Sequence, residues 1–506
     1  MVALDRLEDY FPDWKEREEL AEKMIPIIGK LYRKNIVTYC FGRALYNKTV
    51  TDIMSTHRFV RQVAKNELSE FESYPILKAA AEQDCGPCHF DLGQLTTKHM
   101  NLVESGHNIG VEKFVAEQFS QVVGRHIKPL KQPQDVILYG FGRIGRLMTR
   151  LLIEKTGGGD QLRLRAVVLR PGPENDLKKR AMLLRHDSVH GEFPGTIRID
   201  EVNNCLIING NVVRFIYTQQ PDEVDYEQYG IQDGLVIDNT GVWRDETGLG
   251  QHLKSKGVSR VIVTAPSKGT VPNIVSGINS SDISKDQLIL SAGSCTTNAI
   301  VPVLKVVDAR YGIKHGHMET VHAYTPDQNL LDNFHRKDRR GRAAPLNLVI
   351  TETGASKAVA KLLPQLEGKL TGNAIRVPTP NVSLAILSLS LKKPTTKEDL
   401  NTYLRDISLF SPLQRQIDFT FESEVVSSDF IGNRHACTVD GQATIVANGK
   451  RALIYVWYDN EFGFCCQVIR VIQKWIGIRY PLVPVDIEEM GFSETDLFSQ
   501  FPNAAG

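Results

Sequence analysis

The feature that most constrains the fold is a glycine-rich hexapeptide, Gly140-Phe141-Gly142-Arg143-Ile144-Gly145, which fits the pattern G-x-G-x-x-G. It lies between an apolar run at 136–139 that predicts a strand and a run at 143–154 that predicts a helix. In this setting the first glycine permits a tight turn, the second lets the backbone approach a pyrophosphate, and the third lets helix and strand pack closely. The helix N-terminus then directs amide donors at the phosphates. The motif therefore predicts a dinucleotide-binding loop rather than a plain turn.

The residue after the second predicted strand bears on which dinucleotide binds. Further strand-like runs occur at 164–169, 234–238, 260–264 and 287–291, which predicts a doubly wound parallel sheet. An NAD-preferring site usually has an acidic residue about 20 positions after the glycines. Arg170 stands there instead. Arginine can pair with the 2′-phosphate of NADP, and the alternative is a solvated arginine beside a permissive NAD site. Both interpretations stay open, with NADP use slightly favoured.

The rest of the 506-residue chain divides into further parts that differ in hydrophobic pattern and composition. Residues before about 130 read mainly as helix, with candidates at 14–34, 57–68 and 111–127, and Pro26 should kink or break the first of these. Two prolines in 128–134 predict a linker. After residue 295, longer strand-like runs predict a second, mixed sheet. We therefore expect an α/β fold with these parts: a helical extension (1–132), a Rossmann-type dinucleotide-binding domain (133–294), an α+β catalytic domain (295–459), a helix returning to the first domain (within 460–480) and a tail (481–506).

Composition and charge exclude several classes of protein. The formal net charge of +1 gives no field attractive to nucleic acid or to an anionic membrane. The acidic N-terminal sequence lacks the apolar core of a secretory signal, and no apolar run approaches the ~20 residues of a membrane span. The sequence predicts a soluble, cytoplasmic protein without nucleic-acid or membrane partners.

Eight cysteines scattered over a chain of this length do not predict a disulfide scaffold. Cys85-Gly-Pro-Cys88-His89 invites a redox or zinc interpretation. A structural zinc needs four ligands, however, and no second cysteine pair lies nearby. His99 and His107 could supply ligands, but at a spacing that is not a recognised one. We expect a turn with two ordinary cysteines and no metal site.

Cys295 has the local context of a reactive thiol. It follows Ser294, a candidate cap of a helix that continues with apolar residues at helical spacing. A thiol in the first turn of a helix loses its proton more easily because it feels the positive end of the helix dipole. Buried cysteines without function also occupy helix starts. His322, at a predicted strand end, is on its own more typical of a structural histidine than of a base.

Between about 135 and 480 the chain contains a collinear series of short motifs: Tyr139–Arg146, Asn239–Val242, Ala265–Ser267, Ser294-Cys-Thr-Thr-Asn298, Val321-His322, Thr353–Ala358, Gly368–Gly372, Arg376–Thr379, Val425–Asp429 and Trp457–Gly463. This series resembles the glyceraldehyde-3-phosphate dehydrogenase family. The Ser-Cys-Thr-Thr-Asn segment followed by the downstream histidine is highly specific.

The resemblance implies a role for each matched residue. Cys295 would be the catalytic thiolate and His322 its base. The residues implied to bind NAD or NADP are Gly140, Phe141, Gly142, Arg143, Ile144, Gly145, Arg170, Thr240, Gly241, Thr264 and Asn460, the last through the nicotinamide carboxamide. Thr325 and Arg376 would hold the substrate's phosphate; Ser294, Thr296, Arg340, Thr353 and Gly354 would receive the attacking inorganic phosphate. The aldehyde phosphate would be oxidised through a thioester on Cys295, in a homotetramer to which a loop at 325–344 contributes.

Three departures from the family pattern concern the cofactor. Arg170 replaces the usual acid, Asn333-Phe334 falls where NAD-specific members often carry Leu-Pro, and Phe464 stands where many have tyrosine. Two other functions remain as alternatives to phosphorolysis: phosphate-independent erythrose-4-phosphate dehydrogenase, and a non-catalytic, nucleotide-binding regulatory protein whose extension is the functional part.

Overall fold

The computed structural model describes residues 10–63, 68–107, 109–126, 128, 130–284 and 286–484. These residues form two compact units. Unit 1 takes its described residues from the chain up to Lys131, from Arg405–Arg415 and from Ile478 onward. Unit 2 contains Gln132–Leu404 and Gln416–Gly477. The chain therefore visits unit 1 three times.

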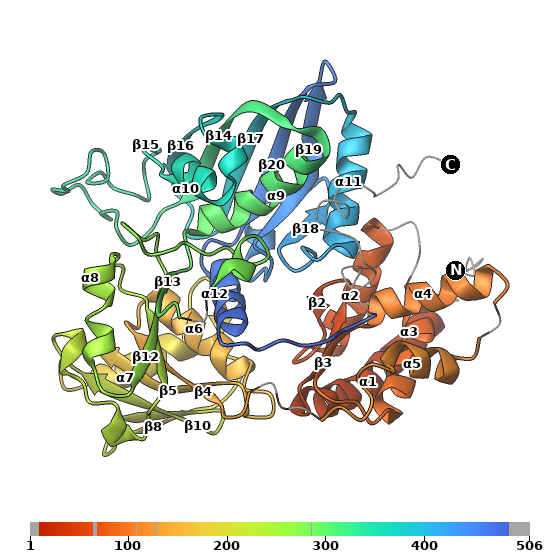
Figure 1. Ribbon diagram of the computed structural model, residues 1–506, viewed down its shortest axis with the longest axis horizontal. Helices are drawn as coiled ribbons and strands as arrows, with labels where there is room; N and C mark the ends of the chain where they lie inside the picture. The colour runs from red at the N-terminus through yellow and green to blue at the C-terminus, as the bar shows by residue number, and fades with distance from the viewer. Residues whose placement is uncertain are drawn as a thin grey trace. The chain divides into compact units, whose positions relative to one another are not determined.

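Unit 1 consists of helices packed on a small sheet (Figure 1). The sheet has the strand order β2-β1-β3-β21, with β1 parallel to β3 and β3 parallel to β21. Its elements are α1 (Tyr10–Arg33), β1 (Ile36–Cys40), β2 (Arg43–Ala44), α2 (Val50–Val63), α3 (Glu70–Glu82), β3 (Cys88–Asp91), α4 (Leu92–Glu104), α5 (Val111–Phe119) and β21 (Leu482–Val483).

The helices expected in the extension are present, but its strands were not expected. α1 continues through Pro26, and α5 ends at Phe119 rather than near 127. Every residue of β1 and β3 is buried, so neither strand shows the apolar–polar alternation that marks a half-buried strand. β21 lies in the segment expected to be a tail, and the rest of that tail, from 485, lies outside the described residues, as does 64–67 of the expected second helix.

The first sheet of unit 2 is the doubly wound sheet that the strand-like runs predicted. Its order is β13-β12-β11-β4-β5-β10-β9-β8, with parallel pairing from β13 through to β10. The strands are β4 (Gln134–Tyr139), β5 (Leu162–Leu169), β8 (Ile197–Asp200), β9 (Cys205–Ile208), β10 (Asn211–Tyr217), β11 (Gly234–Asp238), β12 (Val258–Val263) and β13 (Ile289–Ser291). The connecting elements are α6 (Arg143–Glu154), α7 (Asp176–Arg185), the hairpin β6 (His186–Asp187) and β7 (Gly191–Glu192), and α8 (Glu246–Leu249).

The second sheet of unit 2 is mixed, also as predicted. Its order is β15-β16-β14-β17-β20-β19-β18. The strands are β14 (Ile313–Ala323), β15 (Val349–Thr351), β16 (Leu370–Val377), β17 (Ser383–Leu391), β18 (Ile417–Thr420), β19 (Cys437–Ala447) and β20 (Arg451–Tyr458), and the helices are α9 (Cys295–Tyr311), α10 (Ala355–Leu362) and α12 (Phe462–Trp475). A further helix, α11 (Lys397–Phe410), begins in unit 2, and its residues from Arg405 belong to unit 1. Every second residue of β17 is buried, and α9 contacts β14, β17 and β20. α12 contacts α6, the helix that follows the glycine motif.

Candidate functional site

The glycine motif forms the turn from β4 into α6 that the sequence predicted. Gly140 has φ +95°, a left-handed conformation that disfavours any side chain. A Cβ on Gly145 would lie 2.3 Å from the carbonyl oxygen of Gly140, so only glycine lets the helix approach the strand this closely. Gly142 is the N-cap of α6 and offers no side-chain acceptor to the first amides of the helix. These amides suit a phosphate group, so the loop fits a dinucleotide.

The other predicted cofactor residues follow neighbouring strands of the same sheet. Thr240 and Gly241 come after β11, Thr264 comes after β12 and Arg170 after β5. The register pairs the last residues of these strands, which places the residues that follow at one carboxyl edge. The amide and hydroxyl of Thr240 both donate to Asp238 Oδ1 at 2.7 Å, and the amide of Thr264 donates to the Asp238 carbonyl at 3.0 Å. Phe141 is buried with its ring edge-on to Phe215.

Arg143 belongs to an ionic network rather than pointing freely into the loop. Its guanidinium donates to both carboxylate oxygens of Glu461, at 2.6 and 2.5 Å, and to Asp187 at 3.1 Å. His190 lies in the same network, 3.3 Å from Asp459 Oδ2 through Nε2 and 3.5 Å from Asp187 Oδ1 through Nδ1. The network ties the N-terminus of α6 to the turn that precedes α12.

His190 should make stability depend on alkaline pH. Burial by itself lowers the pKa of His190, but the hydrogen bonds to Asp187 and Asp459 outweigh it and raise the pKa to about 9. A raised pKa contributes stability that is complete below the unfolded value of 6.5 and is lost as pH rises through about 9. We expect His190→Asn to cost about 1–3 kcal/mol at pH 7 and little at pH 10.

Thermal unfolding of the full chain between pH 7 and pH 10 measures this effect. The matched control is His186→Asn, because His186 lies nearby on the chain but is 52% exposed in its side chain. An equal destabilisation by His190→Asn at both pH values would contradict the assignment of a charged His190.

Cys295 and His322 meet across two elements. Cys295 is the first residue of α9, and the Ser294 hydroxyl caps that helix by accepting from the Thr297 amide at 3.0 Å, as predicted. His322 lies near the end of β14, with Nε2 3.5 Å from the Cys295 sulfur. The Nδ1 atom is 2.7 Å from the Ala323 carbonyl. The carbonyl oxygen only accepts and the Arg376 guanidinium, 2.9 Å from the same Nδ1 atom, only donates, so the two contacts compete for that nitrogen, while Nε2 faces the thiol.

Burial dominates the acid–base properties of this pair. It raises the pKa of the Cys295 thiol, an effect that the Arg376 guanidinium partly offsets. Burial and then Arg376 lower the pKa of His322 to about 3. At physiological pH the pair is therefore a neutral thiol beside a neutral imidazole. The helix start alone predicted a more acidic thiol, and desolvation reverses that direction here.

Arg376 reaches the pair because of strand register. β14 and β16 are parallel neighbours in which His322 is opposite Arg376. Arg376 Nη1 lies 2.9 Å from His322 Nδ1 and donates to the Thr325 hydroxyl at 3.2 Å. Thr325, Arg376 and the catalytic pair thus share one face of the site.

Arg340 joins the same group through a residue that the sequence reasoning missed. Asp327 forms an ion pair with Arg340 and accepts a hydrogen bond from the Thr325 hydroxyl. Arg340 is buried and also donates to the Thr351 hydroxyl at 3.2 Å. The sequence signal that could have identified Asp327 was an acidic residue two positions after Thr325, close enough to pair with two arginines.

The remaining predicted phosphate residues lie at or next to the starts of two helices, α9 and α10. Ser294 and Thr296 flank Cys295 on the chain, and Thr353 and Gly354 lead into α10, with the Thr353 hydroxyl accepting from the Ala355 amide at 3.2 Å. Contacts also tie Thr296 to a second residue that sequence reasoning missed: its hydroxyl is 3.0 Å from the hydroxyl of Tyr458, at the end of β20. Thr296 is therefore held on the buried side of the site.

Asn460 lies between β20 and α12 and is buried. Its side-chain oxygen accepts from the Ser383 hydroxyl at 2.8 Å, which leaves the amide nitrogen as the donor end. The same Ser383 hydroxyl is 3.1 Å from the amide of Ala323, next to His322. Asn460 is thereby linked by a single side chain to the strand that carries the base.

The sequence predicted neither a metal site at Cys85 and Cys88 nor a membrane-spanning segment. Cys85 and Cys88 are free, buried thiols whose pKa values burial raises, to about 11 and about 12. Within the described ranges no group of three or more His, Cys, Asp or Glu side chains could hold a metal ion. Each helix that the structure describes is too short or too polar to cross a bilayer.

Comparison with known proteins matches both domains of unit 2. Residues 134–246 match the family described as "Glyceraldehyde 3-phosphate dehydrogenase, NAD binding domain", and residues 294–460 match the "C-terminal domain" of the same enzyme. A "Glyceraldehyde-3-phosphate dehydrogenase-like protein" of Pseudomonas aeruginosa is 58% identical over 464 residues, covering 91% of this chain and 100% of that protein. A glyceraldehyde-3-phosphate dehydrogenase of Borreliella burgdorferi is 38% identical over 342 residues, 67% of this chain and 98% of that protein. The chloroplastic glyceraldehyde-3-phosphate dehydrogenase A of Zea mays is 37% identical over 69% of this chain and 85% of its own length.

The glycine loop, the cysteine–histidine pair and these matches agree with one another. The chain belongs to the glyceraldehyde-3-phosphate dehydrogenase family of NAD(P)-dependent oxidoreductases.

Proposed function

We propose that the protein oxidises an aldehyde phosphate, glyceraldehyde 3-phosphate in the first instance, and releases the product by phosphorolysis of a thioester on Cys295. The observation that supports this most directly is the 3.5 Å contact between the Cys295 sulfur and Nε2 of a neutral His322. A nucleophile next to a base is the arrangement that covalent catalysis requires.

The protons move between Cys295 and His322. Nε2 takes the thiol proton as the sulfur attacks the aldehyde carbon, and passes it to the carbonyl oxygen to give the hemithioacetal. Nε2 removes that proton again as the carbon is oxidised to the thioester. Bound NAD(P)⁺ supplies the hydride acceptor for this oxidation. Inorganic phosphate then attacks the thioester carbon and the sulfur leaves.

Two groups of side chains are proposed to hold the two phosphates. Thr325 and Arg376 would bind the phosphate of the substrate, and Ser294, Thr296, Arg340, Thr353 and Gly354 would receive the attacking phosphate. Planar guanidinium groups suit this task because they bind two oxygens at once. Asp327 would orient Arg340 through their ion pair.

Initial rates with the purified full chain test this proposal. Glyceraldehyde 3-phosphate is supplied with NAD or NADP, with and without inorganic phosphate. Turnover that requires phosphate is expected. Turnover indifferent to phosphate would favour the erythrose-4-phosphate type of reaction, in which water attacks the thioester. Absence of turnover in every combination would contradict the enzymatic proposal and favour a regulatory protein.

Arg170 is proposed to admit NADP. It is exposed directly after β5, at the carboxyl edge of the nucleotide sheet. We expect Arg170→Asp to shift the ratio of kcat/KM values for NADP and NAD toward NAD by about 10–100-fold, since hydrogen bonds to charged groups contribute about 1.5–3 kcal/mol. Arg198→Asp, at an exposed position of β8 in the same sheet, is the control. An unchanged ratio would identify Arg170 as a solvated side chain beside a permissive NAD site.

The long loop between β14 and β15 supports a homo-oligomer, for which we propose the tetramer of the resemblance and a cytoplasmic location. The loop exposes large apolar side chains that a single chain leaves uncovered: Leu330, Leu331, Phe334, Leu346 and Leu348, each at least 68% exposed. Clusters of this kind mark protein–protein interfaces. Analytical ultracentrifugation of the full chain would determine the oligomeric state.

A further inference from the structure

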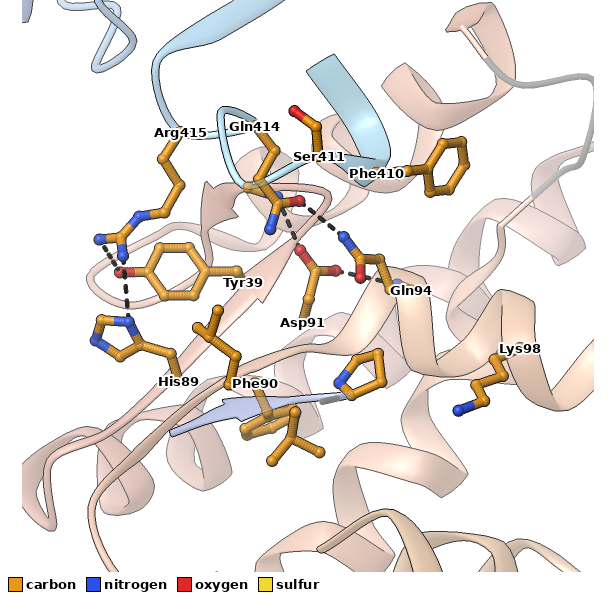
Figure 2. Close-up of a pocket in the computed structure, with 14 residues that line it drawn as sticks. Tyr39, His89, Phe90, Asp91, Gln94, Lys98, Phe410, Ser411, Gln414 and Arg415 are labelled. Carbon is orange, nitrogen blue, oxygen red and sulfur yellow. Dashed lines mark hydrogen bonds between the residues drawn. The ribbon is translucent and has the colours of Figure 1, made fainter. Parts of the chain in front are cut away.

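Unit 1 contains a pocket that the proposed function does not use. Its volume is about 230 Å³. Figure 2 shows that it is lined by β1, β3 and α4 on one side and by the segment 410–415 on the other, and the strand β21 completes it. The family matches begin at residue 134, so the wall formed by β1, β3 and α4 lies outside them.

One wall of the pocket is aromatic. The Tyr39 ring stands edge-on to the His89 ring, with 5.3 Å between centroids, and Tyr480, which does not line the pocket, stacks on His89 at 4.3 Å. Phe90 and Phe410 also line the pocket. Rings fixed by such packing offer a preformed surface for a planar, unsaturated body.

The cationic groups of the pocket come from two positions. The Arg415 guanidinium lies 4.9 Å from the centre of the Tyr39 ring and donates to the Tyr39 hydroxyl at 3.0 Å and toward His89 Nδ1 at 3.2 Å. The five donors of a guanidinium, held in this way, suit a carboxylate or a phosphate. Lys98 lies at the opposite side of the pocket in Figure 2 and is exposed.

Among the described residues of the lining, the one carboxylate is that of Asp91, and its lone pairs are directed at backbone amides. Asp91 Oδ1 accepts from the amides of Phe41 at 2.8 Å and Gln94 at 3.0 Å, and Oδ2 accepts from the amide of Gly42 at 2.8 Å. The side chain of Asp91 thus fixes the turn after β1 and the start of α4.

We propose that this pocket is a second ligand site, which binds a compact organic anion: a planar ring that carries one carboxylate or phosphate group. The acidic group pairs with Arg415, and the ring lies against the aromatic wall. The small volume, below the roughly 300–1,000 Å³ of sites for larger ligands, limits the occupant to about one ring and its acidic group.

Isothermal titration calorimetry on the full chain tests this site with four probes: benzoate, phenyl phosphate, the neutral isostere benzamide, and inorganic phosphate, which has no ring. We expect benzoate or phenyl phosphate to bind once per chain, and the stronger of the two identifies the acidic group. Benzamide is expected to bind at least about tenfold more weakly, because it lacks the acidic group. In Arg376→Gln, in which the proposed phosphate site of unit 2 is weakened, inorganic phosphate is expected to bind at least about tenfold more weakly than the preferred probe, because it has no ring.

Variants locate the binding. Arg415→Gln should weaken the preferred probe about 10–100-fold, and Lys98→Gln, at an exposed position that does not threaten folding, should weaken it about threefold. Lys78→Gln, an exposed lysine of α3 outside the pocket, and Arg376→Gln, in unit 2, should leave the affinity unchanged.

Three outcomes would overturn the proposal: no binding of either ringed anion at 10 mM, benzamide binding as tightly as benzoate, or loss of binding in Arg376→Gln but not in Lys98→Gln. The last would place the anion at the phosphate-binding residues of unit 2. Circular dichroism of Arg415→Gln checks its folding, and Lys98→Gln decides the matter if that variant is unfolded. The test uses no turnover, so its result is independent of the proposed dehydrogenase activity.

Discussion

Replacing Cys295 by serine is expected to reduce kcat on the order of 10⁴-fold or more, because the hydroxyl is a far weaker nucleophile than the thiol and no other side chain can carry the thioester. The variant should still bind NAD(P), since Cys295 lies in α9 of the catalytic sheet while the glycine loop lies before α6. Initial rates and cofactor binding, followed by fluorescence quenching, measure the two effects separately.

Cys205→Ser is the matched control for this variant. Cys205 is buried in β9 and its thiol donates to the Asn203 carbonyl at 3.2 Å, a contact that serine can keep. We expect the control to retain the wild-type rate within about twofold. A Cys295→Ser protein with more than a tenth of the wild-type rate would refute the thioester mechanism.

Replacing His322 by asparagine is expected to lower kcat by about 10²–10⁴-fold, the usual contribution of a general base. The loss should depend on pH, since burial raises the pKa of the Cys295 thiol. Without the imidazole, the thiol must lose its proton to solvent. Alkylation of Cys295 by iodoacetamide should therefore be slow at pH 7 in this variant and accelerate as pH rises, whereas the wild-type protein should show a much weaker pH dependence.

His317→Asn serves as the control for the base, because His317 lies on the same strand, β14, but is exposed. Its ring hydrogen bonds go to Thr371 and Asn373, at 2.9 and 2.8 Å, away from Cys295. A His322→Asn variant with less than a threefold loss of kcat, or with wild-type alkylation at pH 7, would show that another group accepts the proton.

Local sequence signals predicted the parts of the fold that local chemistry determines. The glycine turn, the α6 boundaries and the Ser294 cap each depend on a few adjacent residues, so the sequence alone identified them. The two sheets of unit 2 followed from the order of strand-like and helical runs. Strands β1 and β3 were not predicted, because burial on both faces removes the alternation of apolar and polar residues that identifies a strand.

Features that depend on residues far apart in the sequence were less predictable. The sequence proposed Arg376 and His322 only through a resemblance; their proximity follows from a parallel register across 54 positions. Asp327 was missed because its role depends on where Arg340 returns in the long loop. The pocket of unit 1 has no local signature at all, since four stretches of chain that are far apart in the sequence form it.

Three separate segments of the chain belong to unit 1, and this has a consequence for folding during synthesis. Strand β21, at residues 482–483, pairs with β3, whose residues leave the ribosome almost 400 positions earlier. At 5–20 residues per second, β3 waits roughly 20–80 s for this partner. During that time the edge of β3 that β21 later covers has no intramolecular strand to pair with, and such edges promote aggregation. We therefore expect nascent chains stalled before residue 478 to depend on chaperones that shield unit 1.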